Sequence, residues 1–243
     1  IRRQRQMCIR DSARPYAFLD DAPFEERRTN AIRNRRWADS AEAKDFSVLD
    51  EQAIQRVRRE AWPSVGNAEE LHDALLSAGY FLPQEFDSMA QPAWHQSLMD
   101  TGRIMLLTQL AKPLWVATEQ LPRYRAVFPE QLIRLSLPEV LYSETWNKAD
   151  ALREIIRGRL ECLGPVAAER LAVESALPQS DVYQALLALE VEGFAFQGHF
   201  TPVSQAALAV TGKTPPTEWC ERKLLQRIHR YTIDQHKKKI KPV

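Results

Sequence analysis

Four cations recur along one face of a helix that the sequence predicts from about Glu218 to Ile240. At about 100° per residue, the four that share this face are Lys223, Arg227, Arg230 and Lys237. The apolar stripe on another face comprises Leu224, Leu225, Ile228 and Tyr231. Such a basic face could neutralise successive phosphates of a nucleic acid, and Lys238 and Lys239 would extend it. A solvated helix face is the alternative, and the sequence alone leaves both interpretations open.

A helix predicted from Pro178 to Glu192 offers a second set of polar contacts. Its possible contacts with DNA are Gln179, Ser180, Tyr183 and Gln184. Asp181, Glu190 and Glu192 place negative charge beside them, and repulsion from phosphates disfavours deep docking in a major groove. Packing against protein and direct contact with DNA therefore both remain open for this helix.

The sequence contains no pattern that predicts catalysis or metal binding. The stretch ALAVTGKT, Ala207 to Thr214, fits a loose phosphate-loop pattern, but Ala207 replaces the first glycine and two prolines follow. We interpret it as an ordinary polar loop. The five histidines lack metal-ligand spacing, and the three cysteines stand far apart without a CxxC pair. We expect no cofactor and no structural metal, and a reducing cytoplasmic setting.

The whole chain has a net charge of only +1, so any surface for nucleic acid must be local. An Arg-dense stretch from Phe24 to Trp37 is either a further phosphate-contacting patch or a solvated helix. A hydrophobic content of 44% is sufficient for real cores. No apolar run approaches the length of about 20 residues that a bilayer span needs, and we expect no membrane partner.

The predicted elements follow the same outline twice. In the first outline, two helices begin at the capping residues Asp50 and Asn67, and another helix ends near Gly102. Two short strands follow, Arg103 to Thr108 and Leu114 to Ala117. After a connector, one helix ends at Gly164, a second opens at Pro165, and a third carries Leu186 and Leu189 inward, with Gln184 exposed. A tight wing is then predicted from Gly193, the aromatic run Phe194 to Phe196, Gly198 and Phe200. Helices followed by a β-hairpin are typical of a winged helix.

These patterns predict a mainly α fold with small β-hairpin wings, an α+β class with tandem winged-helix domains and a long C-terminal helix. The expected organisation is residues 1–12 as an assembly artefact, 13–48 as an Arg-rich connecting segment, 49–130 and 147–203 as the two winged-helix units joined by 131–146, and 204–243 as a loop and basic helix. Both ends are interpreted as cut, with a further domain expected beyond the last helix.

Several ordered blocks resemble the C-terminal region of bacterial large helicase-related (Lhr) proteins, from about Arg14 to Val243. They are LDEQAIQRVRREAWP, EELHDALLSAGYF, LWVATEQLP, ALREIIRGRLECLGPVAAERLA, ALLALEVEGFAFQGHF and EWCERKLLQRIHRYT. The resemblance implies a place inside a superfamily 2 ATP-dependent DNA helicase of DNA repair, whose two RecA-like motor domains use ATP and magnesium and are absent from this sequence. It carries no catalytic residue onto this chain.

The resemblance implies DNA, single-stranded or forked, and the rest of the helicase chain as partners. Two alternatives remain beside the accessory DNA-binding interpretation. In the first, the chain is part of a glycosylase-like repair enzyme whose active centre lies outside this sequence. This alternative arises because the family's tandem winged-helix array resembles a DNA glycosylase family. The other is a winged-helix transcription regulator, which the interpretation of both ends as cut disfavours.

Overall fold

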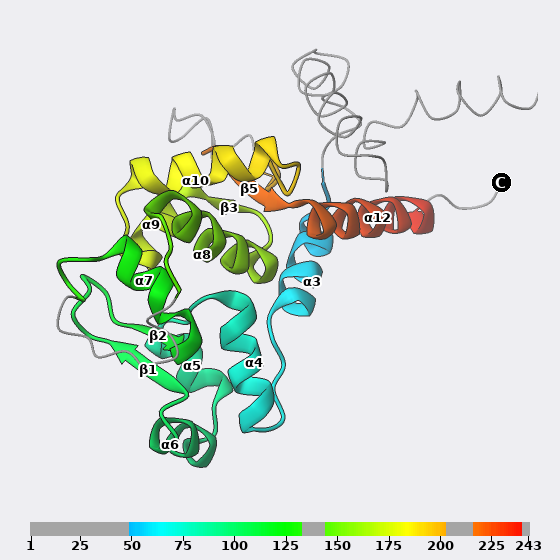
Figure 1. The fold of residues 1–243 in the computed structure, drawn as a ribbon. Helices are drawn as coiled ribbons and strands as arrows, with labels where there is room; N and C mark the ends of the chain where they lie inside the picture. Colours follow the sequence, from blue (N-terminus) through cyan, green and yellow to red (C-terminus); the bar gives the residue numbers. More distant parts are fainter. Residues whose placement is uncertain (1–48, 133–143, 203–215, 240–243) are drawn as a thin grey trace, which may run out of the picture.

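The computed structural model describes residues 49–132, 144–202 and 216–239. Residues 1–12, the Arg-dense stretch and the phosphate-loop look-alike lie outside these ranges. Within them the fold is mainly helical with two small antiparallel sheets, which confirms the α+β class (Figure 1). The helices are α3 (Glu51–Ala61), α4 (Ala68–Ala78), α5 (Pro83–Met89), α6 (Pro92–Asp100), η3 (Thr118–Gln120), α7 (Leu121–Val127), α8 (Lys148–Leu163), α9 (Ala168–Ser175), α10 (Gln179–Val191) and α12 (Arg222–Lys239). The strands are β1 (Ile104–Leu107), β2 (Leu114–Ala117), β3 (Val166–Ala167), β4 (Ala195–Gly198) and β5 (Glu218–Glu221).

Three helices begin at a short polar side chain that caps their first turn. The side-chain oxygens of Asp50, Asn67 and Asn147 each accept a hydrogen bond from the backbone N–H three residues later, at 2.8 to 3.0 Å. These bonds satisfy donors that have no partner inside a helix. The starts of α3, α4 and α8 are therefore fixed by local sequence, as the capping patterns at Asp50 and Asn67 predicted.

In the first half of the chain, three helices are followed by a short β-hairpin. β1 pairs with β2 from Ile104↔Ala117 to Leu107↔Leu114, which confirms both predicted strands. Between α4 and α5, Phe81 forms an antiparallel bridge with Trp115 of β2, through two backbone hydrogen bonds of 2.9 and 3.0 Å. β2 therefore lies between β1 on one side and the bridge at Phe81 on the other. Along the chain, α4, α5 and α6 precede this hairpin.

The second half repeats this order, and its sheet has three strands rather than two. Its elements run α8, β3, α9, α10, β4 and β5, and the antiparallel sheet has the order β3-β5-β4. In both halves the last strand lies between the strand after the third helix and the segment after the first helix. That segment is β3 in the second half and the isolated bridge at Phe81 in the first. One chain order and one strand order thus occur twice.

Two boundaries predicted in the second half were wrong. The long helix begins at Arg222, because Glu218–Glu221 forms β5 and buries Trp219 and Cys220 completely. The second helix begins at Ala168, because Val166 and Ala167 pair with β5 as β3. A two-residue strand and a four-residue strand lack a periodicity that distinguishes them from the first turn of the following helix.

The prediction of a tight wing was also wrong about the position of its second strand. Only Ala195–Gly198 of the aromatic run forms a strand, and β5 supplies its partner from beyond residue 216, with Gln197 opposite Trp219. Glu218 closes the base of this hairpin, since its carboxylate accepts hydrogen bonds from the N–H groups of Phe200 and Thr201 at 3.0 and 2.7 Å.

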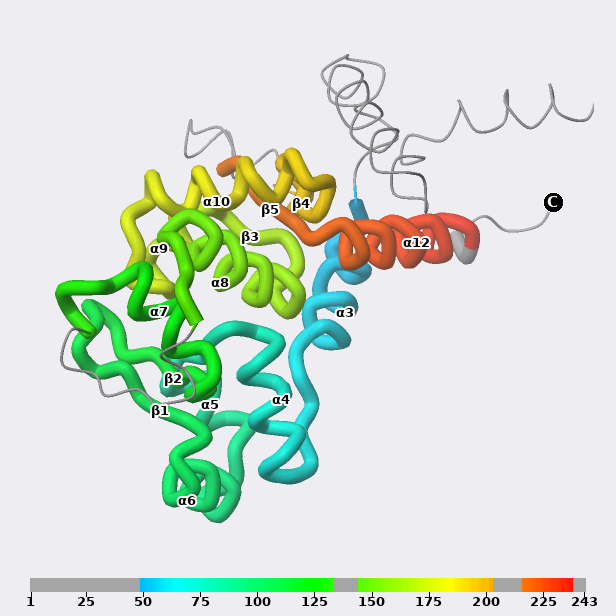
Figure 2. The backbone as a smooth tube through the Cα atoms, viewed as in Figure 1, coloured from blue at the N-terminus to red at the C-terminus, as the bar shows by residue number. Residues whose placement is uncertain are grey.

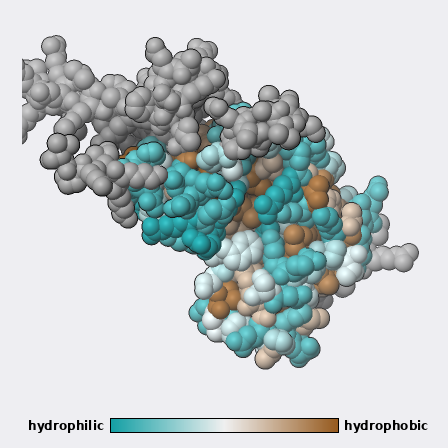
Figure 3. Space-filling view, turned by 180° about the vertical axis from the view of Figure 1, so that it is seen from behind, coloured by the Kyte–Doolittle hydropathy of each residue, from teal (hydrophilic) through white to brown (hydrophobic). Residues whose placement is uncertain are grey.

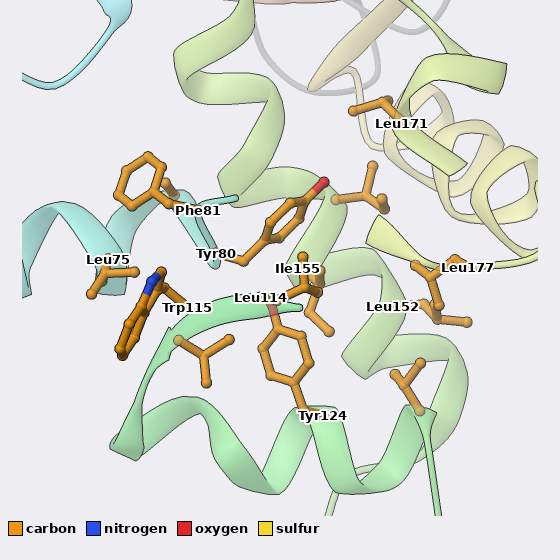
Figure 4. Packing of buried hydrophobic residues seen from close by; sticks show 14 of the residues in the cluster. Leu75, Tyr80, Phe81, Leu114, Trp115, Tyr124, Leu152, Ile155, Leu171 and Leu177 are labelled. Atoms are coloured by element: carbon orange, nitrogen blue, oxygen red, sulfur yellow. The ribbon is translucent and has the colours of Figure 1, made fainter. Parts of the chain in front are cut away.

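A single apolar core joins both halves, and α8 runs through its centre. In Figure 4, Tyr80 and Tyr124 from the first half lie beside Ile155 of α8, while Leu171 and Leu177 approach from the second half. The Tyr124 hydroxyl donates to the carbonyl of Gly79 at 3.0 Å. The two halves therefore share their hydrophobic stabilisation.

The backbones of the two halves approach each other closely at Gly158 of α8. A Cβ atom built there would lie 2.4 Å from the carbonyl oxygen of Ser77 and 3.0 Å from the carbonyl carbon of Ala78, both in the backbone of α4. A backbone oxygen in a helix cannot move aside as the end of a side chain can. The absence of a side chain at this position lets α4 and α8 pack this closely.

We expect Gly158→Ala to lower the free energy of unfolding by at least about 1 to 3 kcal/mol, because the added methyl group forces two packed helices apart. Urea denaturation followed by circular dichroism measures this change. Gly66→Ala is the control, since its Cβ would meet only a Glu70 carboxylate oxygen at 3.4 Å, and it should change stability little. Equal stability of the two variants would contradict the helix contact.

Helix α3 packs against α12 rather than inside the first half, where it was expected. A second apolar cluster joins Ile54 and Val57 of α3 to Leu224, Leu225 and Ile228 of α12. The N–H of Asp50 also donates to the hydroxyl of Thr232 at 3.0 Å. The two helices form a separate pair at one end of the molecule (Figure 2).

Candidate nucleic-acid interface

Helix α12 presents the predicted basic face, with its four cations on the side away from the buried stripe. Lys223, Arg230 and Lys237 are exposed, whereas Arg227 is half-buried. Leu224, Leu225 and Ile228 are buried against α3, and Tyr231 packs at the edge of that cluster. The predicted division of this helix into an apolar side and a basic side is confirmed.

Glu60 of α3 forms an ion pair with Arg227 of α12. Its carboxylate accepts hydrogen bonds from Arg56 at 2.7 Å, from Arg227 at 2.5 Å and from the hydroxyl of Tyr231 at 3.0 Å. The hydrogen bond from Arg56 is the main reason that the pKa of Glu60 falls to about 2, with Arg227 and Tyr231 adding to it. Glu60 therefore stays ionised at any physiological pH, and Arg227 serves first to hold α12 against α3.

Helix α3 adds cations that the sequence patterns did not connect with α12. The Arg56 guanidinium lies over the Tyr231 ring at 4.0 Å from its centroid, so it borders the basic face of α12. Arg59 is exposed and makes no hydrogen bond or ion pair with any residue that the structure describes. The missed signal was the run RVRR in α3, which could not be assigned to a surface before the partner helix was known.

Charge is concentrated in this helix pair, which we call the α3–α12 ridge. The sequence of α12 holds seven Lys or Arg and one Asp, a net +6, and α3 holds three Arg and two Glu, a net +1. The pair thus carries +7 in a chain whose total is +1, so the remaining sequence carries −6. Seen from behind, the end of the molecule that carries the ridge is densely hydrophilic (Figure 3).

Helix α10 differs from the ridge in the chemistry of its outer face. Gln179, Ser180 and Tyr183 are exposed at its start, as expected, yet Gln179 donates to Glu169 and the Tyr183 ring packs edge-on against Trp219. The sequence of α10 contains no Lys or Arg. Its exposed side chains one turn apart are apolar: Tyr183, Leu187 and Val191.

The acidic groups around α10 already have partners. Asp181 pairs with Lys148 at 2.8 Å, and Glu192 pairs with Arg153 at 3.1 Å and with Arg157. Two Arg side chains of α8, Arg153 and Arg157, are thus directed to Glu192. The structure does not bring the polar residues of α10 together with the cations of α12, because α10 lies over α8 and α12 lies against α3 (Figure 1).

Two of the described histidines and both described cysteines occupy structural positions. His72 is buried between Arg103 at 2.9 Å and Glu119 at 3.1 Å, and His95 packs edge-on against Trp115. Burial raises the pKa of the Cys162 thiol to about 11 and also raises that of Cys220. The described ranges contain no group of His, Cys, Asp and Glu that would hold a metal ion. They also contain no helix with the length and apolarity of a membrane span.

No protein-family description matches the sequence, and no curated protein matches it either.

Proposed function

We propose that this chain is a DNA-binding accessory region of an Lhr-type ATP-dependent DNA helicase and that the α3–α12 ridge contacts the DNA backbone. The observation that carries the DNA-binding part is the concentration of +7 on two adjacent helices of a chain with net charge +1. Cations on one surface bind a polyanion by releasing its counterions. The link to the helicase rests on the sequence resemblance.

The repeated topology supports the proposal of tandem winged-helix units. A winged helix has three helices and a three-stranded antiparallel sheet, with its first strand after the first helix and its wing between the last two strands. α8, α9 and α10 with β3, β4 and β5 fit this order. In the first half, α4, α5 and α6 with the Phe81 bridge, β1 and β2 fit it as well.

The second unit would not read DNA through its third helix. In the second unit that helix is α10, whose outer face carries apolar side chains and no cation. Reading base edges in a major groove needs hydrogen-bonding side chains and tolerance of nearby phosphates. We therefore assign α10 to packing against protein within the helicase, and DNA contact to the ridge. ATP and magnesium would serve the motor domains of that helicase.

The ridge is tested by titrating single-stranded and forked DNA at several salt concentrations, with the parent chain and Lys223→Gln/Arg230→Gln. Arg227 is left in place because it ties α12 to Glu60. Loss of two phosphate contacts should weaken binding and reduce the log–log salt slope by about 1.4 for single strands. The loss should be similar across DNA sequences, because phosphate contacts do not read bases.

The matched control is Lys112→Gln/Lys148→Gln, which removes two exposed cations away from the ridge. Lys112 lies in the β1–β2 turn, at the opposite side of the molecule from α12 (Figure 1). Circular dichroism confirms that all variants fold. The proposal fails if the ridge variant keeps the affinity and slope of the parent, or if the control loses as much.

A further inference from the structure

A pocket of about 420 Å³ lies where the end of α3 meets α5, the end of α8, β3 and α9. Its polar wall contains Arg58, Arg59, Arg170 and Glu85, and its apolar wall contains Trp62 and Val166. This volume falls in the range of about 300 to 1,000 Å³ that is typical of small-molecule sites. We call it the arginine pocket.

The pocket is electropositive. Its lining contains three guanidinium groups and one carboxylate, and that carboxylate, Glu85, already accepts a hydrogen bond from the buried Arg159 at 2.5 Å. Arg58 is fixed in place because it donates to the carbonyl of Pro165 at 2.6 Å. Since Glu85 is compensated from the interior, the charge left for a ligand is positive, which favours an anion.

Arg59 is the cation available to that anion. Arg58 and Arg170 each have a partner within the protein, the latter Glu174 at 2.7 Å. Arg59 has no such partner among the described residues, and its side chain is exposed. A guanidinium presents several donors in a planar fork that matches phosphate oxygens. Arg59 therefore has the chemistry and the accessibility to take a phosphate group.

Trp62 supplies an aromatic wall beside these cations. Its ring is only partly buried and is held by an edge-to-face contact with Phe81, with centroids 5.6 Å apart. The Arg159 guanidinium lies 5.5 Å from its centroid. Aromatic side chains next to a basic groove bind the bases of single strands by stacking, with little dependence on sequence.

We propose that the arginine pocket binds one nucleotide of a single DNA strand, with its phosphate at Arg59 and its base against Trp62. This rests on the proposed DNA-binding function and adds a defined subsite to it. Arg56, beside Tyr231 of α12, and Arg59, in the pocket at the end of the ridge, lie about one turn apart on α3. A strand that follows the ridge can therefore continue into the pocket.

The test uses the full chain and three probes: inorganic phosphate, the mononucleotide dTMP and a single-stranded deoxythymidine oligonucleotide. Binding is compared in the parent, Arg59→Gln and the control Lys112→Gln. Loss of a charge-assisted hydrogen bond should weaken the binding of dTMP and the oligonucleotide at least about tenfold in Arg59→Gln only. An oligonucleotide carrying 5-bromodeoxyuridine should photocrosslink to Trp62, and dTMP should compete.

The outcomes separate this subsite from the ridge. Unchanged oligonucleotide affinity in Arg59→Gln, with a normal salt slope and no crosslink at Trp62, would overturn the pocket and leave the ridge intact. Equal affinity for inorganic phosphate and dTMP would overturn the base contact and hence the nucleotide site. Absence of oligonucleotide binding in the parent, while dTMP still binds and depends on Arg59, would overturn the DNA function and with it the strand part of this inference.

Discussion

Arg159→Ala should lower the free energy of unfolding by about 3 to 5 kcal/mol, because it removes the cation from a buried ion-pair network. The Arg159 side chain is 0% exposed, and its Nη2 atom lies 2.5 Å from Glu85 and 3.4 Å from Glu174. These contacts tie α8 to α5 and α9. Without the guanidinium, Glu85 would lose its ion pair and Glu174 would keep only Arg170, so urea denaturation should occur at a much lower midpoint.

Arg170→Ala is the matched control for this change. Arg170 also pairs with Glu174, at 2.7 Å, but its side chain is 58% exposed. Exposed ion pairs of this kind contribute about 0 to 1 kcal/mol, so the control should remain close to the parent. Similar small losses in both variants would mean that the Arg159 network is not a major determinant of stability.

Leu186→Ala should cost about 2 to 5 kcal/mol, because it opens a cavity between α10 and α8. Leu186 and Leu189 are 0% exposed, as predicted from the helical spacing. Gln184, two residues earlier, is exposed, as predicted, and Gln184→Ala should change stability by no more than about 0.5 kcal/mol.

Thermal and urea unfolding of the two variants would measure this difference. The comparison is made within one helix, so helix propensity contributes little beside burial. Comparable effects at Leu186 and Gln184 would contradict the orientation of α10 and would also remove the basis for its exposed apolar row.

The orientation of α10 bears on how the chain would work inside a helicase. Its buried side holds the second unit together, and its outer side offers Tyr183, Leu187 and Val191 rather than cations. In the proposed function, the winged units act as a rigid body that joins the helicase and supports the ridge. The single core shared by both halves fits such a role, because separating them would expose its apolar side chains to water.

Local sequence determined most helices and the division of α12 into two faces. The caps at Asp50, Asn67 and Asn147 act within one turn, and an apolar stripe repeats every three or four residues. Both effects depend on neighbours a few residues away, so a single sequence contains them. The cations Lys223, Arg230 and Lys237 could therefore be predicted as one exposed face.

Tertiary structure alone decided which partners these elements meet. β5 pairs with strands about 20 and 50 residues earlier, Arg227 finds Glu60, and Arg56 joins the basic face of α12 from α3. The arginine pocket likewise combines Arg59 with Arg170 and Trp62 with Val166. Such contacts depend on how distant segments pack, and packing is selected by the burial of the whole core rather than by any local pattern.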